Sequence, residues 1–192
     1  MCNKKGVLAV VSGPSGCGKG TVLRHVLSHE EYAISVSATT RGPRVGEVDG
    51  VSYFFITKED FLRRIEEDKF LEHAIYCGNR YGSLRDYVEG LRCQGKHVIL
   101  EIETEGAFMV KGNAPDALLL FVSPPDMETL EKRLRGRGTE DEETVKERLA
   151  KAVEEMKCIP KYDHCIINRE GEAEKAAEEI MALITAYHNK IN

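Results

Sequence analysis

The sequence contains no tryptophan, no Cys-x-x-Cys pair and no long apolar run. A membrane-spanning helix needs about 20 consecutive apolar residues, so we expect no membrane span. The absence of closely paired cysteines gives no support for a structural zinc site. The short apolar run at 6–11 leads into a glycine-rich turn and not into a small-residue cleavage site, which argues against a secretion signal. We therefore expect a cytoplasmic protein whose cysteines are reduced thiols.

Concentrated positive charge is also lacking. The chain has 27 lysines and arginines against 32 aspartates and glutamates, which gives a net charge of −5. Proteins that coat nucleic acid or an anionic membrane need a concentrated basic face, so we expect neither as a partner. With 192 residues, 42% of them hydrophobic, the chain fits one globular domain. Nothing in its composition predicts an oligomeric state.

Short apolar segments rich in β-branched residues alternate with segments of helical periodicity. The expected strands are 7–12, 96–102, 118–122 and 164–167. The expected helices are 21–27, 126–135 and 172–187. A further helix is expected after Thr139, with Glu142 as its capping-box partner and with Glu147 and Lys151 paired at four-residue spacing. This alternation indicates an α/β fold with a parallel sheet that is covered on both faces.

Residues 37–91 interrupt the alternation. The stretch 37–50 is polar and rich in turn residues. The segments after it predict a strand at 51–56, a helix at 58–68, a mixed stretch to Gly82 and a helix at 83–93. We interpret this block as a subdomain inserted into the main fold.

A glycine-rich turn lies between the first expected strand and the first expected helix. It consists of Gly13, Pro14, Ser15, Gly16, Cys17, Gly18, Lys19, Gly20 and Thr21. The glycines let successive backbone N–H groups point at anionic oxygens, the helix adds its positive end, and Lys19 adds a point charge for the outer phosphates of a ligand. The usual pattern has a hydroxyl directly after the lysine, whereas here Gly20 stands there and Thr21 follows. Whether Thr21 approaches Mg²⁺ directly or through water is therefore left open.

Two arginines, Arg41 and Arg44, stand three residues apart in a loop that is braced by Pro43. The planar donors of two guanidinium groups form a fork suited to one phosphate group. The hydroxyl groups of Tyr53 and Tyr81 are candidate donors to the same phosphate. Each residue alone is as consistent with an ordinary surface or packing role. Together with the glycine-rich loop, they predict a second phosphate site.

Glu72 is a candidate for recognising a nucleotide base. Guanine presents its N1–H and its N2 amine side by side, and one carboxylate accepts both hydrogen bonds. Adenine lacks this donor pair, so a carboxylate left without partners would reject it. Glu101 and Glu103 stand two apart at the end of an expected strand, where the ligands of parallel sheets collect.

The Gly18-Lys19-Gly20-Thr21 sequence resembles the loop of several nucleoside-monophosphate kinases. The segment 35–55 closely resembles the signature of the guanylate kinases, and the resemblance extends from Val7 to the last helix. It implies a three-layer P-loop NTPase fold with a core at 1–36 and 92–192, a GMP-binding insert at about 37–91 and a lid at about 136–148. It also implies a Mg²⁺-dependent transfer of the γ-phosphoryl group from ATP to GMP.

The resemblance assigns roles to residues that their patterns alone leave open. It implies that Ser37 and Ser83 contact the base, that Glu103 lies near GMP, that Glu101 supports Mg²⁺ through water, that Asn168 lies beside the ATP base, and that the lid arginines are Arg133, Arg137 and Arg148. The family commonly has aspartate at positions 101 and 103 and glutamine at 105, where this sequence has glutamate.

Two other interpretations remain. The first is a P-loop kinase that acts on a different nucleotide or on a sugar phosphate; such a substrate has no use for the Glu72 carboxylate or for Ser37. The second is a guanylate-kinase-like scaffold domain that binds peptides and has lost catalysis. Such scaffolds typically lose phosphate-loop residues, whereas Gly18 and Lys19 are intact here. His25 and His29 stand four apart on a helix but have no evident third ligand, so we interpret them as a surface pair.

Overall fold

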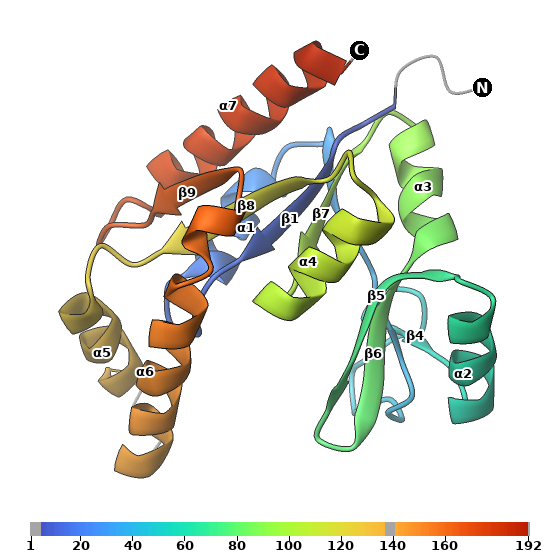
Figure 1. The fold of residues 1–192 in the computed structure, drawn as a ribbon, viewed down its shortest axis with the longest axis horizontal. Coiled ribbons are helices and arrows are strands. Elements are labelled where there is room, and N and C mark those ends of the chain that lie inside the picture. Colours follow the sequence, from blue (N-terminus) through green and yellow to red (C-terminus); the bar gives the residue numbers. More distant parts are fainter. Residues whose placement is uncertain (1–4, 137–140, 192) are drawn as a thin grey trace.

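The computed structural model describes residues 5–136 and 141–191 (Figure 1). At its centre lies a five-stranded parallel sheet with the strand order β2-β7-β1-β8-β9. The strands are β1 (Leu8–Ser12), β2 (Tyr32–Ile34), β7 (His97–Glu101), β8 (Leu118–Ser123) and β9 (His164–Ile167). The expected parallel sheet is confirmed, and β2 is an edge strand that the sequence pattern did not predict.

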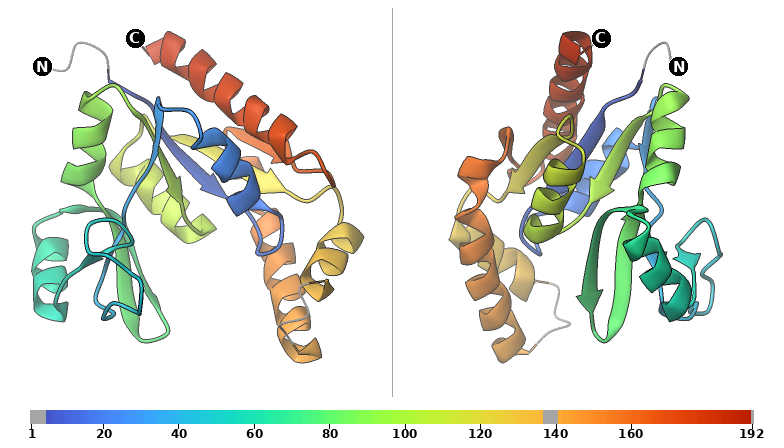
Figure 2. Two further views of the ribbon diagram at one scale, coloured as in Figure 1. Left: turned by 180° about the vertical axis from the view of Figure 1, so that it is seen from behind. Right: turned by 45° about the vertical axis from the view of Figure 1, so that its right-hand side comes forward.

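Helices cover both faces of this sheet (Figures 1 and 2). They are α1 (Lys19–Val26) and α7 (Ala173–Ile191) on one face, and α3 (Arg85–Cys93) and α4 (Thr104–Asn113) on the other. The side chains of β1 alternate between the two faces: Ala9 and Val11 pack with α1 and α7, whereas Leu8 and Val10 pack with α3 and α4. A strand buried on both faces needs such a continuous apolar run, and the expected three-layer α/β fold follows from it.

A second sheet of four strands, in the order β4-β3-β6-β5, lies beside the first (Figure 1). It consists of β3 (Ala38–Thr39), β4 (Phe54–Phe55), β5 (Phe70–Tyr76) and β6 (Asn79–Leu84), with α2 (Lys58–Glu66) against it. Its small core is formed by Ala38, Phe61 and Phe70. All these elements come from the segment that interrupts the main alternation.

The stretch that looked mixed in the sequence is the antiparallel hairpin of β5 and β6. Its turn residues Cys77 and Gly78 have φ angles of 47° and 76°, as the tight turns of hairpins require. The helix expected to begin at Ser83 begins instead at Arg85, because Ser83 pairs with Glu72 in the hairpin.

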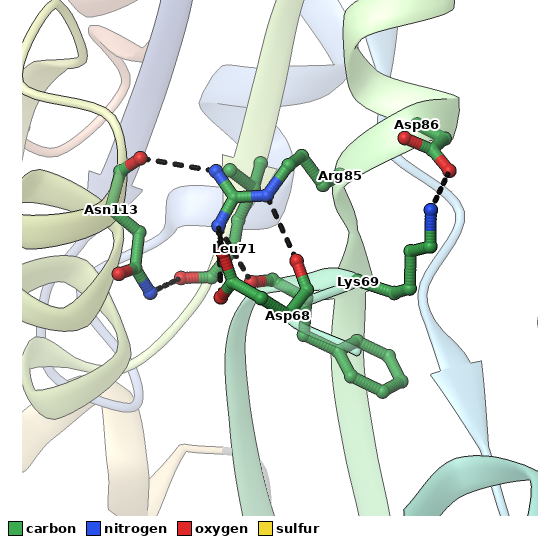
Figure 3. A network of polar contacts seen from close by, with 7 residues as sticks. Asp68, Lys69, Leu71, Arg85, Asp86 and Asn113 are labelled. Carbon is green, nitrogen blue, oxygen red and sulfur yellow. Dashed lines mark hydrogen bonds and ion pairs between the residues drawn. The ribbon is translucent and has the colours of Figure 1, made fainter. Parts of the chain in front are cut away.

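Arg85 fastens the second sheet to the core (Figure 3). Its guanidinium group donates to the backbone carbonyl oxygens of Asp68 and Asn113, each at 3.1 Å. The Asn113 amide in turn donates to the carbonyl oxygen of Leu71 at 3.0 Å. The end of α4 is thereby joined to the start of β5 and to the start of α3.

Two helices, α5 (Met127–Arg135) and α6 (Glu142–Met156), pack on each other through Leu130, Leu134, Val145 and Ala152. The N-cap of α6 is Asp141, which accepts a hydrogen bond from the Thr144 backbone at 2.8 Å. The cap that the sequence predicted at Thr139 lies outside the described residues. The expected pairing of Lys151 with Glu147 is wrong, because Lys151 donates to Glu103.

The cysteines differ from the expectation at one position. Cys17, Cys77, Cys158 and Cys165 are free thiols. Cys93 is disulfide-bonded, so the prediction of a reduced thiol is wrong at this position, because its sulfur forms a disulfide bond. None of the helices described for this chain is both long enough and apolar enough to cross a membrane.

Candidate active site

The glycine-rich loop, residues 13–21, curls between the end of β1 and the start of α1. Gly13 and Gly18 have φ angles of 147° and 91°, which side-chain-bearing residues rarely adopt. A Cβ at Gly13 would lie 2.1 Å from the carbonyl oxygen of Val122, and one at Gly18 would lie 2.4 Å from the Asn168 amide nitrogen. Only glycine fits at these two positions, and the backbone can therefore curl tightly.

Lys19 begins α1 and folds over this loop. Its ammonium group donates to the carbonyl oxygen of Gly13 and, at 3.3 Å, to that of Pro14. The Cys17 sulfur lies 3.9 Å from the same ammonium group. Burial raises the pKa of the Cys17 thiol, although the nearby Lys19 charge opposes this. The lysine charge is thus held at the mouth of the loop, beside the groups that would face phosphate oxygens.

Arg133 and Asn168 brace the loop from outside. Arg133 donates to the carbonyl oxygens of Cys17 at 3.2 Å and of Asn168 at 3.0 Å. The Asn168 amide also donates to the Cys17 carbonyl, at 2.8 Å. These residues line a cavity of about 650 Å³ next to the loop, together with Gly16 and Thr21. The cavity is large enough for the base and ribose of a nucleotide whose phosphates lie in the loop.

The helix α6 brings Arg148 over the loop from the other side, where its guanidinium group donates to the Ser15 hydroxyl at 2.7 Å. Of the three arginines that the sequence predicts for a lid, Arg133 and Arg148 therefore both contact the loop. Arg137 lies outside the described residues.

Thr21 and Glu101 line one cavity of about 450 Å³ with Lys19 and Gly20. A Cβ at Gly20 would contact nothing within 4 Å, so there is open space at this position. The Thr21 hydroxyl accepts a hydrogen bond from Arg24, which lines the same cavity, at 3.2 Å. Hydroxyl and carboxylate oxygens are the donors that Mg²⁺ prefers, and Mg²⁺ usually keeps several waters and phosphate oxygens as its other ligands. Across residues 5–136 and 141–191, no group of three or more histidine, cysteine or acidic side chains forms a complete metal cage. The residues present fit a metal that a bound nucleotide helps to hold.

A third cavity, also of about 450 Å³, lies between the two sheets. Its lining includes most of the residues predicted for an acceptor nucleotide, namely Ser37, Arg41, Arg44, Tyr53, Glu72, Tyr81 and Glu103. Ser83 lines a smaller adjoining cavity of about 220 Å³, which it shares with Ser37, Tyr53 and Glu101. The fold thus gathers side chains from several strands and loops around one space.

At one end of this cavity, Arg41 is held by Glu47, a residue that the sequence analysis did not single out. Their two hydrogen bonds measure 2.8 and 3.0 Å, and Glu47 also accepts from the Arg44 backbone at 2.7 Å. The guanidinium carbon of Arg41 lies 5.5 Å from the centroid of the Tyr53 ring. Because of its bond to Arg41, the pKa of Glu47 is lowered. The signal in the sequence that could have indicated this role of Glu47 is its position three residues after Arg44 in the same turn.

At the other end, Glu72 is only 6% exposed. Burial raises the pKa of its carboxyl group, and the hydrogen bond from Ser83, at 2.7 Å, opposes that rise. The helix α4 closes the cavity behind it, since a Cβ at Gly106 would lie 3.3 Å from the Glu72 carboxylate. A buried acceptor of this kind is costly to leave without a donor, so it selects strongly among ligands.

A parallel sheet whose first strand leads into a lysine-bearing phosphate loop, with an arginine-lined pocket beside it, defines a P-loop nucleoside-monophosphate kinase. The comparisons with known proteins agree. The family model described as guanylate kinase matches residues 5–187. A guanylate kinase of Clostridium perfringens (strain SM101 / Type A) is 48% identical over 185 residues, which cover 96% of this chain and 85% of that protein.

Further relatives cover nearly the whole chain. A guanylate kinase of Bacillus anthracis is 45% identical over 190 residues, or 98% of this chain and 92% of that protein. The crystal structure of guanylate kinase from Anaplasma phagocytophilum superposes with a TM-score of 0.71 at 32% identity, and covers 98% of this chain and 89% of that one. The chain belongs to the guanylate kinase family.

Proposed function

We propose that this enzyme transfers the γ-phosphoryl group of ATP to GMP, with Mg²⁺, and releases ADP and GDP. The observation that carries the proposal is the acceptor cavity, whose lining includes the buried Glu72 carboxylate and the guanidinium group of Arg41, which Glu47 holds in place. Glu72 accepts the N1–H and the N2 amine of guanine, while Ser37 and Ser83 complete the contacts to the base. Residues 37–91 act as the GMP-binding insert, and the location is cytoplasmic.

The acceptor phosphate lies at the opposite end of that cavity. Arg41 and Arg44 bind its oxygens through planar N–H donors, and the hydroxyl groups of Tyr53 and Tyr81 add hydrogen bonds. Glu47 holds the Arg41 side chain in place before the ligand arrives, so little conformational entropy is lost on binding. Glu103 lies at the boundary between this cavity and the phosphate loop.

The donor nucleotide binds at the phosphate loop, next to the acceptor cavity. The backbone of residues 13–21 and the Lys19 ammonium group bind its phosphates, while Asn168 lies beside its base. Arg133, Arg137 and Arg148 stabilise the charge that spreads over the moving phosphoryl group. Mg²⁺ would supply further positive charge on the phosphate oxygens, held on the protein side by Thr21 and, through water, by Glu101.

The reaction needs little proton transfer. An oxygen of the GMP phosphate is already anionic when it attacks the γ-phosphorus, and the bond from that phosphorus to the bridging oxygen of ADP breaks. Catalysis therefore consists mostly of positioning the two phosphates and of stabilising charge. A short lid at about 136–148, which contains Arg148, closes over the donor and excludes water from the transfer.

The test is a coupled assay of ADP release with ATP and Mg²⁺, in which GMP, AMP, CMP and UMP are offered in turn. We expect GMP to be strongly preferred and Lys19→Ala to abolish turnover. In Glu72→Ala we expect kcat/KM for GMP to fall by about 10²–10⁴-fold, since two hydrogen bonds to a charged group contribute about 1.5–3 kcal/mol each. Glu59→Ala, on the exposed side of α2, is the matched control and is expected to leave activity unchanged.

Two results would overturn the proposal. A folded protein that turns over no nucleotide would favour a peptide-binding scaffold. Preference for another acceptor, with Glu72→Ala equal to the unmodified enzyme, would favour a P-loop kinase of different specificity.

A further inference from the structure

Lys151 lies on α6, and its ammonium group donates to the Glu103 carboxylate at 2.8 Å. The two residues stand 48 positions apart, so the contact joins separate elements. The side chains are 56% and 67% exposed, and exposed ion pairs contribute at most about 1 kcal/mol to stability. The stability of the fold therefore depends little on this pair, and its significance lies in its position.

The pair lies where the two nucleotide cavities meet. Lys151 and Glu103 line a cavity of about 300 Å³ together with Gly13, Ser15 and Lys19 of the phosphate loop. Glu103 also lines the acceptor cavity. In the proposed reaction, the donor and acceptor phosphates must approach each other in this region.

The charges around this cavity are balanced. Within the described chain, its lining contains three carboxylates, those of Glu101, Glu103 and Glu155, and three cations, those of Lys19, Arg148 and Lys151. When nucleotides bind, Lys19 and Arg148 interact with phosphate oxygens. Lys151 is then the cation that offsets Glu103, whose negative charge would otherwise repel two polyanionic substrates.

The local geometry fits this division of roles. Arg148 and Lys151 are three residues apart on α6 and therefore lie on the same face of the helix. Arg148 reaches Ser15 on the donor side, whereas Lys151 reaches Glu103 on the acceptor side. Glu103 is the N-cap residue of α4, yet its side chain makes no capping hydrogen bond. Its carboxylate extends to Lys151 instead.

We propose that Lys151 is a positioning residue of the acceptor site, which holds the Glu103 carboxylate and neutralises its charge so that GMP can bind beside it. This inference rests on the proposed function. Lys151 acts on the acceptor through Glu103, and its effect on the donor nucleotide is smaller.

The test compares Lys151→Met, Lys151→Arg, Glu103→Gln and the double variant Lys151→Met/Glu103→Gln. In Lys151→Met we expect KM for GMP to rise roughly 5- to 20-fold at low ionic strength, with a smaller change in KM for ATP and the same Tm. The effect should shrink as salt is added. Lys151→Arg should restore most of the affinity, since it keeps the charge.

The double variant separates charge compensation from other effects. Once Glu103 is neutral, loss of Lys151 should change KM for GMP by less than about two-fold relative to Glu103→Gln alone, because the two residues act as a pair. Lys157→Met is the matched control, since Lys157 ends the same helix and pairs with Glu154 at 2.7 Å. We expect its kinetics to equal those of the unmodified enzyme.

The two proposals fail in different ways. If the unmodified protein turns over GMP but Lys151→Met has the same KM for GMP, or if the two substitutions are additive, the role of Lys151 is overturned alone. A lower Tm of Lys151→Met with unchanged KM would also overturn it, because that result indicates a purely structural role. If the unmodified protein does not turn over GMP, the proposed function and this inference are both wrong.

Discussion

The side chain of Arg41 is held by Glu47, a neighbour that contacts no substrate in the proposed complex. Glu47 holds both terminal nitrogens of its guanidinium group, at 2.8 and 3.0 Å. The hydrogen bond to Arg41 lowers the pKa of Glu47, so the pair persists into mildly acidic solution. A long side chain that is fixed in advance loses less rotamer entropy when it binds phosphate.

Glu47→Gln should therefore weaken GMP binding without affecting the transfer step. We expect KM for GMP to rise about ten-fold while kcat changes less than about two-fold, as follows when only uniform binding is lost. Steady-state kinetics with GMP as the varied substrate measure both values. Glu67→Gln is the matched control, because Glu67 pairs with the exposed Arg63 of α2 at 3.0 Å. An unchanged KM in Glu47→Gln would show that Arg41 does not need this support.

Single residues were predictable where their chemistry lies in a short segment of sequence. The phosphate loop, Arg41 and Arg44 belong to such segments, and the structure brings them to cavities. The role of Lys151 was not predictable, because its spacing favours Glu147 as its partner, whereas the fold brings its ammonium group to Glu103. Helical spacing ranks only the partners on the same helix, and it cannot rank a carboxylate from another element.

Among the elements, α3 depends on a buried arginine. Arg92 is fully buried and donates to the carbonyl oxygen of Gly6 at 2.8 Å, and to Glu89 and Asp116 at 2.8 and 2.5 Å. Burial raises the pKa of Asp116, but the hydrogen bond from Arg92, the charges of Arg92 and Lys5 and a backbone hydrogen bond together outweigh this effect and leave the pKa lowered. The residue thus joins α3 to the start of β1 and to the turn before β8.

We expect Arg92→Met to lower the free energy of unfolding by about 1–3 kcal/mol, because the buried Gly6 carbonyl loses its donor. Arg63→Met removes exposed ion pairs on α2 and should cost less than about 1 kcal/mol. Denaturant unfolding of both variants measures the difference. Equal losses in the two variants would contradict a specific role for the buried arginine.

The elements that the sequence pattern missed share a weak local signal. α4 contains two glycines and shows little amphipathic periodicity, yet it forms because Ala107 and Val110 pack against the sheet. The β5–β6 hairpin turns at Cys77 and Gly78, a pair less characteristic of hairpins than Asn-Gly. In both cases tertiary packing decides the structure, and local propensity does not.

For the molecule as a whole, the attachment of α7 to the sheet contains an acid-sensitive contact. His97 of β7 is 8% exposed, and its Nδ1 accepts a hydrogen bond from the Val7 backbone at 3.1 Å. Its ring lies 4.9 Å from that of His188 on α7 and 5.4 Å from that of Tyr32 on β2. Burial, and then the charge of His188, lower the pKa of His97, while Glu31 opposes the shift.

The folded protein therefore binds fewer protons at His97 than the unfolded chain does. Its contribution to stability is complete above the unfolded pKa of about 6.5 and is lost as the pH falls below that value. We expect the free energy of unfolding to fall between about pH 7 and pH 5.5, and to fall less steeply in His97→Asn. The exposed His29→Asn is the control. The same slope in His97→Asn as in the unmodified protein would contradict this assignment.

At this scale the class of fold was predictable and the arrangement of its strands was not. Alternating strands and helices predicted a parallel sheet with two covered faces. The order β2-β7-β1-β8-β9 depends on crossovers between segments far apart in the sequence, for example the pairing of Leu8 in β1 with Val98 in β7. Apolar periodicity contains no information on which buried strands become neighbours.

Because of the direction of the strands, the first and last described residues of the chain lie far from the phosphate loop. Gly6 lies just before the start of β1 and α7 ends beside the start of β7, whereas the phosphate loop follows the opposite end of β1 (Figure 1). Both ends of the described chain, Lys5 and Ile191, therefore lie at the end of the sheet opposite to the phosphate loop. Immobilised enzyme that is anchored at either of these two residues should therefore keep its nucleotide cavities accessible.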